Sequence, residues 1–335
     1  MNLELLEKYY DEGWLIKQTH LTLPLTIWNY SQATQYEGKW DEITLQCRGL
    51  VTDEMGNIVA RPFKKFFNIE EGKHTITDEF EVYEKMDGSL GIAFYYDGKW
   101  IFASRGSFTS EQAIKGGEMF KDNFQQSHFS KDSTYMFEII YPENRIVVDY
   151  AGSERLVLLG RIGTKSGEEY SLDQFRKNGY DVVKNYNNIK NYKYLKQNIG
   201  KNREGFVVKF SNGDRCKIKG EEYIRLHKIM TEISTKSVWE CLSSGNDIYK
   251  ILEDVPDEFF NKIEEYVEEL KHQYIMLETE YVWIFNKMGH LINDRAEFAK
   301  LAKRYKYPQL LFKMLDGSDY SETLWRIIKP EFRKL

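Results

Sequence analysis

A lysine stands where a predicted strand meets a glycine turn in EVYEKMDGSLGIAFYYDGKW, residues 81–100. Lys85 ends a run of alternating apolar residues, and Asp87 and Gly88 follow it directly. Such a lysine is either a solvated residue at a strand end or a nucleophile held within reach of a phosphate. Because Lys-x-Asp-Gly is short and Asp-Gly is a common turn, this stretch alone favours the structural interpretation. The catalytic interpretation requires partner residues elsewhere in the chain.

Two further lysines, Lys217 and Lys219, are separated by one residue in the predicted strand CKIKG. Side chains two positions apart on a strand point to the same face, so both lysines line one surface while Cys216 and Ile218 take the other. The alternative is an edge strand whose lysines discourage further strand pairing. In isolation the two interpretations are equally good.

Two acidic residues fall within otherwise apolar strands. Glu138 lies in YMFEIIY, and Glu204 precedes Gly205 at the start of EGFVVKF. A half-buried carboxylate is unfavourable unless it pairs with a cation, a metal ion or a hydrogen-bond donor. Each acid is therefore a candidate ligand, and the alternative is a solvent-facing acid on an amphipathic strand.

Several cations lie beside glycines or aromatic residues. CRG contains Arg48, RPFKKFFN contains Arg61, Lys64 and Lys65, and SRGS contains Arg105. Arginine and lysine are the residues that clamp phosphate groups. Clusters of this kind are, however, usually solvated surface.

These short motifs follow one another in the order CRG, RPFKKFFN, EKMDGSL, SRGS, MFEIIYPENRIV, EGFVVKF and CKIKG, between residues 47 and 220. The order resembles that of the covalent nucleotidyltransferases, which comprise DNA ligases, RNA ligases and mRNA capping enzymes. It is most similar to RNA ligases of the bacteriophage T4 RNA ligase 1 group, because CRG and RPFKKFFN are upstream features of that group. The resemblance covers about residues 40–228. It departs from the phage pattern at Arg105, where a lysine is usual, and after Lys219, where helices replace the OB-fold of DNA ligases and capping enzymes.

The resemblance implies an ATP-dependent RNA ligase that works in three steps. A lysine attacks the α-phosphate of ATP, the AMP moves to a 5′-phosphate on RNA, and a 3′-hydroxyl then displaces the AMP. Lys85 is then the nucleophile, and Lys217 and Lys219 stabilise charge on the α-phosphate. A free lysine has a pKa of about 10.4. We therefore expect desolvation or nearby positive charge to lower the pKa of Lys85.

The same resemblance implies contacts to nucleotide and metal. Arg48 and Lys65 suit the β- and γ-phosphates, and Phe67 either stacks on the nucleotide or is a core aromatic. The expected nucleotide contacts are Arg48, Lys65, Phe67, Asp87, Gly88, Arg105, Glu138, Glu204 and Gly205. The expected ligands of a hydrated Mg²⁺, with Mn²⁺ as the alternative ion, are Glu138, Glu204 and Asp247. Asp87 could also be a simple turn former, and Gly88 would allow positive φ or a close approach of backbone to phosphate.

The 335-residue chain exceeds the size at which one core stops growing, so we expect two domains. Apolar runs around turns at 54–57, 97–98 and 212–213 predict hairpins, and two more strands are expected on either side of residues 142–144. Segments 107–124 and 171–180 look helical. We therefore predict an α+β nucleotidyltransferase domain of antiparallel sheets with flanking helices over residues 1–223.

From residue 224 to 335 the pattern becomes helical. Apolar residues recur with the helical period over 256–289, and further helices are expected to end at Pro308 and Pro330. We predict an all-α domain here that selects the RNA, with Trp239, Trp283 and Trp325 in its core.

Composition limits the partners. The net charge of −5 means that RNA contacts need local basic patches. Segment 184–203 has no acid and interleaves cations with tyrosines, which suits a single strand or an ordinary amphipathic loop and helix. The three cysteines form no metal motif, and neither a signal sequence nor an apolar run of about 20 residues is evident. We therefore expect a cytoplasmic protein, in the host cytoplasm if phage-encoded, without a membrane span.

The expected substrate is RNA with 5′-phosphate and 3′-hydroxyl ends, tRNA being one candidate, in a repair pathway without an obligate protein partner. A nick-sealing polynucleotide ligase and a catalytically degraded nucleotide- or RNA-binding module are the alternatives.

Overall fold

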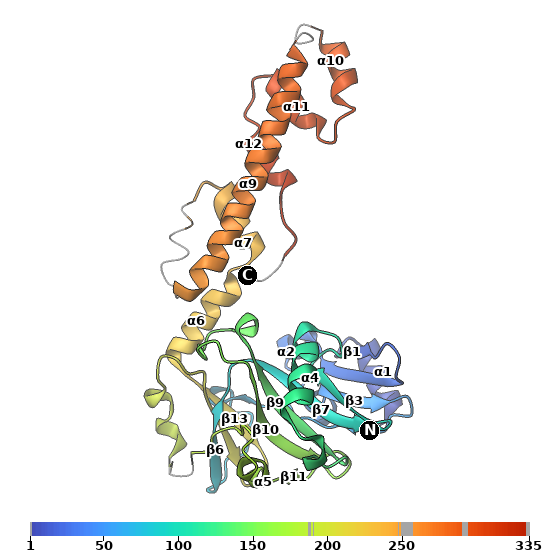
Figure 1. Cartoon of the computed structure of the whole chain (residues 1–335), viewed down its shortest axis with the longest axis vertical. Coiled ribbons are helices and arrows are strands. Elements are labelled where there is room, and N and C mark those ends of the chain that lie inside the picture. Colours follow the sequence, from blue (N-terminus) through green and yellow to red (C-terminus); the bar gives the residue numbers. More distant parts are fainter. Residues whose placement is uncertain are drawn as a thin grey trace. The chain divides into compact units, whose positions relative to one another are not determined.

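The computed structural model describes residues 2–332 apart from 187, 188, 190, 247, 249–256 and 290–293. The chain divides into two compact units, Met1–Ile224 and Arg225–Leu335. The first contains the strands, and the second is built from helices (Figure 1).

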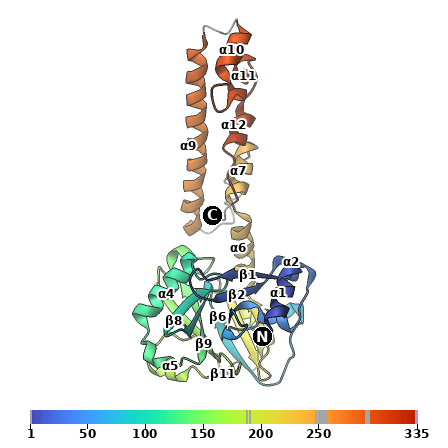
Figure 2. The same cartoon turned by 90° about the vertical axis from the view of Figure 1, so that its right-hand side faces the viewer.

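Three sheets form the first unit (Figures 1 and 2), with strand orders β1-β2-β3-β4, β11-β10-β9-β7-β8 and β5-β13-β12-β6. The last is called the lysine sheet because it carries Lys85, Lys217 and Lys219. The paired strands are antiparallel except β5 and β13, which are parallel. The strands are β1 (Leu15–Thr19), β2 (Leu25–Tyr30), β3 (Arg48–Asp53), β4 (Ile58–Ala60), β5 (Phe67–Asn68), β6 (Phe80–Lys85), β7 (Ser89–Tyr96), β8 (Lys99–Ser104), β9 (Ser133–Ile140), β10 (Arg155–Gly163), β11 (Glu169–Tyr170), β12 (Gly205–Phe210) and β13 (Arg215–Lys219).

Short helices connect these strands. Ser110 caps the longest of them, α4, by accepting a hydrogen bond from the Ala113 N–H, and the helix buries Ala113, Met119 and Phe120. The helices are α1 (Leu3–Asp11), α2 (Gln32–Glu37), α3 (Glu42–Gln46), α4 (Glu111–Asn123) and α5 (Asp173–Lys177), and the 3₁₀ turns are η1 (Ile69–Glu71), η2 (Gln126–His128), η3 (Pro142–Asn144), η4 (Tyr192–Tyr194) and η5 (Lys196–Asn198).

The lysine sheet has one apolar and one charged face because its side chains alternate. The apolar face contributes Val82, Phe206, Val208, Phe210, Cys216 and Ile218 to a cluster that Tyr192 and Leu195 complete. The residues between them therefore face the opposite way, and they are Glu81, Tyr83, Lys85, Val207, Lys209, Arg215, Lys217 and Lys219.

The second unit is a set of helices along α9 (Figure 2). One face of α9 buries Ile263, Tyr266 and Leu270. Further along the helix Ile284 is buried in another cluster, together with Met288, which directly follows the helix. The helices are α7 (Thr235–Ser243), α9 (Asp257–Lys287), α10 (Arg295–Ala302), α11 (Pro308–Leu315) and α12 (Ser321–Ile327), while α6 (Glu221–Glu232) crosses the division between the units. No helix of the described residues combines the length and apolarity needed to cross a membrane.

The α+β class, the three hairpins, the helices at α4 and α5 and the helical C-terminal part are confirmed. The second strand expected after residue 144 is wrong, because the N–H groups of Val147 and Val148 bond to a side chain instead of a neighbouring strand. Pro308 does not end a helix but begins α11. Trp239 and Trp325 pack on the core as expected, whereas Trp283 is 60% exposed, so its expected burial is wrong.

Candidate active site

Lys85, Gly205 and Lys219 lie side by side on three neighbouring strands of the lysine sheet. Because neighbouring strands are about 4.8 Å apart, the two lysines start about 10 Å from each other. Gly205 lies between them with φ of +149°, and a Cβ there would be 2.0 Å from the carbonyl oxygen of Ile218. Glycine is therefore required at this position. Because Gly205 has no side chain, the space above the sheet between the two lysines is not filled from the middle strand.

Glu204 pairs with both of these lysines. Its Oε2 lies 2.6 Å from Lys85 Nζ and its Oε1 lies 3.1 Å from Lys219 Nζ, although its side chain is only 3% exposed. Two ammonium groups thus compensate a buried carboxylate that would otherwise be strongly unfavourable. In this arrangement the Lys85 nitrogen is engaged in an ion pair.

Lys217 lies two residues before Lys219 on the same face of β13. Burial, together with the positive charges of the neighbouring cations, lowers the pKa of Lys217 to about 7. These cations are Lys65, Lys85, Arg48 and Lys219. The edge-strand explanation fails at Lys217, because β13 pairs with β12 on one side and with β5 on the other. The expected concentration of positive charge around the lysines is therefore present.

Glu138 comes from β9 of the five-stranded sheet. Burial raises the pKa of its carboxyl to about 8, an effect that Lys85 opposes and Glu204 reinforces. Gly88 packs against this strand, and a Cβ at Gly88 would lie 2.6 Å from the Ile139 carbonyl oxygen and 3.1 Å from Glu138 Cγ. Gly88 is not among the glycines with positive φ, so packing against β9 requires glycine here, and the expectation of positive φ is wrong.

Asp87 is held by hydrogen bonds rather than directed at the cavity. Its Oδ2 accepts from the N–H groups of Val147 and Val148 at 2.8 Å each, and its Oδ1 accepts from the Tyr223 hydroxyl at 2.7 Å. The Asp87 N–H donates to the Tyr150 hydroxyl at 2.8 Å. With a side chain that is 3% exposed, Asp87 anchors the turn after Lys85 to distant parts of the unit. This supports a structural role that goes beyond turn formation, and not the expected contact with nucleotide.

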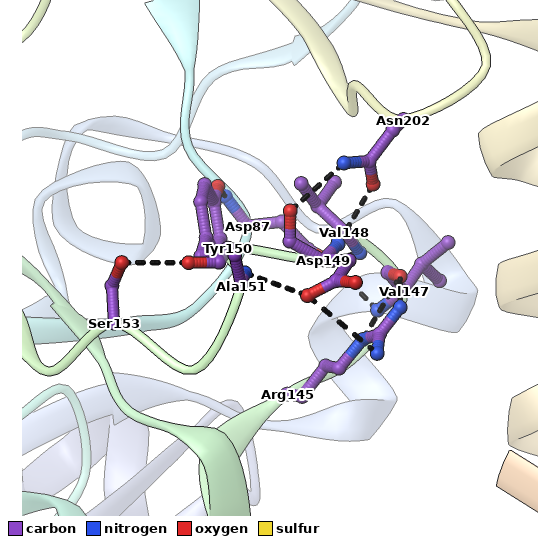
Figure 3. A network of polar contacts seen from close by, with 9 residues as sticks. All are labelled: Asp87, Arg145, Val147, Val148, Asp149, Tyr150, Ala151, Ser153 and Asn202. Atoms are coloured by element: carbon purple, nitrogen blue, oxygen red, sulfur yellow. Dashed lines mark hydrogen bonds and ion pairs between the residues drawn. The ribbon is translucent and has the colours of Figure 1, made fainter. Parts of the chain in front are cut away.

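The segment whose N–H groups donate to Asp87, residues 147–148, is followed by residues that are fixed to the loop before Glu204 (Figure 3). The Asp149 N–H donates to Asn202 Oδ1 at 2.7 Å, and Asn202 Nδ2 donates to the Asp149 carbonyl at 2.8 Å. Arg145 closes the segment locally by donating to the Val147 carbonyl at 3.2 Å. The lysine end of β6 and the glutamate loop are thus joined through residues 145–153.

A second group of cations surrounds the Tyr30 hydroxyl. Lys65 Nζ donates to it at 3.3 Å and an Arg105 nitrogen at 3.4 Å. Burial alone would raise the pKa of Tyr30, but Lys65, Arg105 and Arg48 together outweigh burial and lower it. Burial lowers the pKa of Arg48. Tyr30 has no motif around it, and sequence reasoning missed it.

Phe67 lies beside this second group. It is 6% exposed and makes an edge contact with Trp40 at 5.1 Å between ring centroids, while Lys65 Nζ lies 5.4 Å from its ring centroid. This placement supports the core-aromatic interpretation.

A cavity of about 750 Å³ opens between the lysine sheet and the five-stranded sheet, within the first unit. Its volume is in the range of small-ligand sites. Of the expected site residues it is lined by Arg48, Lys85, Gly88, Arg105 and Glu138. Lys65, Phe67, Asp87, Glu204, Gly205, Lys217 and Lys219 are not part of its lining. Glu204 nevertheless connects to the cavity through its ion pair with Lys85, and Lys219 connects through its own ion pair with Glu204.

The expected three-ligand metal site is not assembled in the described residues, which contain no group of three or more acidic, histidine or cysteine side chains suited to a metal ion. Asp247 lies outside the described residues. Glu204 is close enough to Glu138 for its charge to raise the pKa of the Glu138 carboxyl. Two carboxylates of this kind fit a hydrated Mg²⁺, which keeps several waters and uses few protein ligands.

Segment 184–203 is largely integrated into the fold. Tyr192 is buried in the cluster under the lysine sheet, Lys196 pairs with Glu70 at 2.8 Å and Arg203 pairs with Glu84 at 3.3 Å. These contacts support the ordinary structural interpretation of the segment, although Lys190 lies outside the described residues.

Antiparallel sheets that place a lysine, a buried glutamate and further cations beside a nucleotide-sized cavity are typical of a nucleotidyltransferase. A family model described as RNA ligase, of the T4 RNA ligase 1 type, matches residues 46–223, more than half of the chain. The chain belongs to this RNA ligase family.

Curated relatives agree with this family. A putative bifunctional polynucleotide kinase/RNA ligase of Autographa californica nuclear polyhedrosis virus is 27% identical, with 56% of this chain and 31% of the relative covered. An RNA ligase of Rhodothermus phage RM378 is 23% identical, with 84% and 83% covered. The chain therefore spans about a third of the first relative and most of the second. An archaeal ATP-dependent RNA ligase structure is 15% identical with a TM-score of 0.48, covering 79% of this chain and 75% of that one, a likeness too low to bear on activity.

Proposed function

We propose that this chain is an ATP-dependent RNA ligase that joins 3′-hydroxyl and 5′-phosphate RNA ends through lysyl-AMP and adenylylated-RNA intermediates. The observation that carries this proposal is the row of Lys85, Gly205 and Lys219, with Glu204 holding both lysines, in a chain of the RNA ligase family. This row supplies a nucleophile, a second cation and the space between them.

In the first step Lys85 Nζ attacks the α-phosphorus of ATP. A nitrogen–phosphorus bond forms, the bond to the bridging oxygen breaks, pyrophosphate leaves, and the lysine gives up its proton. Lys217 and Lys219 offset the negative charge that develops on the α-phosphate. The group of Arg48, Lys65 and Arg105 around Tyr30 is suited to the β- and γ-phosphates.

In the second step an oxygen of the RNA 5′-phosphate attacks the phosphorus of lysyl-AMP, so the nitrogen–phosphorus bond breaks and Lys85 regains a proton. In the third step the 3′-hydroxyl of the other RNA end attacks the 5′-phosphorus. A phosphodiester bond forms, AMP leaves with the phosphate oxygen, and the hydroxyl proton passes to solvent.

Glu138 and Glu204 are the residues that would hold a hydrated Mg²⁺, or Mn²⁺ in its place. A bound divalent ion would supply positive charge at the α-phosphate. It would also favour the ionised form of Glu138, whose pKa burial raises to about 8. Asp247 is the proposed third ligand, and formation of lysyl-AMP is proposed to proceed without it.

The helices from residue 224 onward are proposed to select the RNA. Repair of broken RNA, such as tRNA, in the cytoplasm of a cell or of a phage host is the proposed setting, supported by the match to a phage RNA ligase over most of this chain.

The test is label transfer from ATP carrying a radioactive α-phosphate. Wild-type protein should retain label after denaturation, and Lys85→Ala should retain none. Lys64→Ala, an exposed lysine of RPFKKFFN, is the matched control and should label normally. Labelled Lys85→Ala protein would overturn the assignment of the nucleophile, and an unlabelled wild type would favour the degraded binding module. Ligation of single-stranded RNA in competition with a nicked duplex separates the RNA ligase from the nick-sealing enzyme.

A further inference from the structure

The second unit carries a short run of cations where α10 ends and α11 begins (Figure 2). Residues 300–306 have the sequence KLAKRYK, which contains no acid. This segment is called the cationic turn. Its cations are Lys300, Lys303, Arg304 and Lys306, and all four are exposed. The cationic turn is therefore a compact patch of positive charge that solvent can reach.

The acids of α9 lie in a different part of the second unit. Segment 264–269, in the first half of α9, presents four exposed glutamates. The chain directly after the cationic turn is fixed to the second half of α9, because the Tyr307 N–H donates to the Tyr281 hydroxyl at 2.9 Å. Positive and negative charge are thus segregated along α9. This is the kind of local basic patch that an acidic protein needs in order to bind a nucleic acid.

The cations of the turn are not neutralised within the protein. In the part of the chain that the structure describes, the side chains of Lys300, Lys303 and Arg304 form no ion pair or hydrogen bond. Lys271 of α9, by contrast, pairs with Glu268 at 2.8 Å. Residues three and four positions apart at a helix end are neighbours, so the charges at 300, 303 and 304 repel one another. An anionic partner would relieve this repulsion.

The dipole of α10 explains only part of the cluster. Cations stabilise the C-terminal end of a helix, but the effect is confined to its last turn. Because α10 ends at Ala302 with Lys303 as its C-cap, Lys300 and Lys303 benefit from the dipole. Arg304 and Lys306 lie beyond it. Helix stability therefore does not account for the whole run of cations.

An aromatic ring is exposed among these cations. Tyr305 lies between Arg304 and Lys306 and is 37% exposed. Its ring has no aromatic or hydrogen-bond partner among the described residues. Proteins bind single-stranded nucleic acids through cations that follow the phosphates and through exposed rings on which bases stack. The cationic turn offers both kinds of group within seven residues.

We propose that the cationic turn binds single-stranded RNA, with its cations on the phosphates and Tyr305 stacked on a base. The inference rests on the proposed function, because it names the surface through which the second unit engages the RNA to be joined. The charge of the turn favours a polyanion. The exposed ring between two cations favours unpaired bases over the side chains of an acidic protein.

The test measures the binding of fluorescently labelled oligouridylate to the full-length chain over a series of salt concentrations. Lys303→Gln combined with Arg304→Gln should lower the affinity about tenfold, and should reduce the slope of log affinity against log salt by about 1.4, because each phosphate contact on a single strand contributes about 0.7. The charge-matched control is Lys236→Gln combined with Lys271→Gln, two lysines of the same unit that pair with glutamates. It should keep the wild-type affinity and slope.

Tyr305 separates stacking from charge. Tyr305→Ala should lower the affinity about fivefold without changing the salt slope, because stacking involves no counterion release. Tyr305→Phe retains the ring and should bind as the wild type does. Wild-type affinity and slope in a Lys303→Gln, Arg304→Gln protein with a normal thermal unfolding profile would overturn the inference. An equal loss in the charge-matched control would overturn it too, because net charge alone would then explain the binding.

This experiment distinguishes failure of the inference from failure of the proposed function, because RNA binding requires no catalysis. If the wild type forms no lysyl-AMP, the proposed function fails, and the RNA comparison still decides whether the cationic turn binds RNA. Normal label transfer together with RNA binding that does not depend on the turn would overturn the inference alone. Polyglutamate that displaces the labelled RNA as effectively as unlabelled oligouridylate of equal charge would favour an acidic protein partner and would also overturn it.

Discussion

The two compact units use charge in opposite ways. The first unit buries Glu204 and Asp87 and compensates each with cations or hydrogen-bond donors. The ion pairs described in the second unit, such as Lys271–Glu268 and Arg295–Asp316, are exposed, and its helices pack through apolar clusters. Buried charges are retained only at a cost in stability, whereas exposed pairs contribute little. The difference indicates that the chemistry belongs to the first unit.

Removing a lysine from each unit should give the largest contrast. We expect Lys219→Ala and Lys217→Ala each to slow formation of lysyl-AMP by about 10²- to 10³-fold, because each removes a preorganised positive charge. Lys271→Ala, which removes an exposed partner of Glu268, should leave the rate unchanged. Single-turnover label transfer measures all three. Wild-type rates in either site variant would mean that the charges of the lysine sheet serve the fold and not the reaction.

A matched pair of aspartates tests the same contrast on stability. Asp87→Ala leaves two buried N–H groups and the Tyr223 hydroxyl without their acceptor, so we expect the free energy of unfolding of the first unit to fall by about 3 kcal/mol. Asp316→Ala breaks the exposed pair with Arg295 and should cost less than about 1 kcal/mol. Urea unfolding followed by circular dichroism distinguishes them. If both variants lost the same free energy of unfolding, Asp87 would not be a buried anchor of the first unit.

The lowered pKa of Lys217 predicts a pH dependence. Without nucleotide, Lys217 loses its positive charge as pH rises through about 7, so ATP affinity should fall by severalfold between pH 6 and pH 8. The effect on stability has the opposite sign. The unfolded chain binds more protons than the folded one between pH 7 and the ordinary lysine pKa of 10.5, so this group's contribution to stability rises with pH in that window.

Calorimetric titration of Lys85→Ala with ATP measures the affinity. Adding Lys217→Arg should flatten the profile, because arginine stays charged, while Lys219→Arg should keep the wild-type slope. A slope that survives Lys217→Arg would assign the titration to another group, and Glu138 is then the first candidate.

The smallest effect on adenylation should come from removing the second unit. A chain ending at Glu232 retains α6 and the Tyr223 contact to Asp87. We expect it to form lysyl-AMP within about tenfold of the full-length rate but to lose its preference among RNA substrates. A folded protein of this length that cannot adenylate would show that the helices, Asp247 among them, contribute to the catalytic site.

Local patterns in the sequence determined much of this protein. The order of short motifs gave the family, and the Asp97-Gly98 and Asn212-Gly213 turns between alternating strands gave two hairpins. The shared face of Lys217 and Lys219 also followed from sequence, because the period of two is a property of any strand. The turns and the shared strand face depend on residues within about ten positions of one another, whereas the motif order extends over residues 47–220.

The tertiary structure decided which groups meet. Glu204 pairs with Lys85 across more than a hundred residues, and the Tyr223 hydroxyl donates to Asp87 across a still longer separation in sequence. Tyr30 and Asn185 lie at the site although neither belongs to a recognisable sequence motif. The strand expected after Pro142 is absent for the same reason, since its N–H groups bond to Asp87. Burial and the charges of neighbouring residues set the pKa of Lys217 and of Glu138. That burial and those charges exist only in the folded unit, where the strands of the lysine sheet pack together and meet the five-stranded sheet.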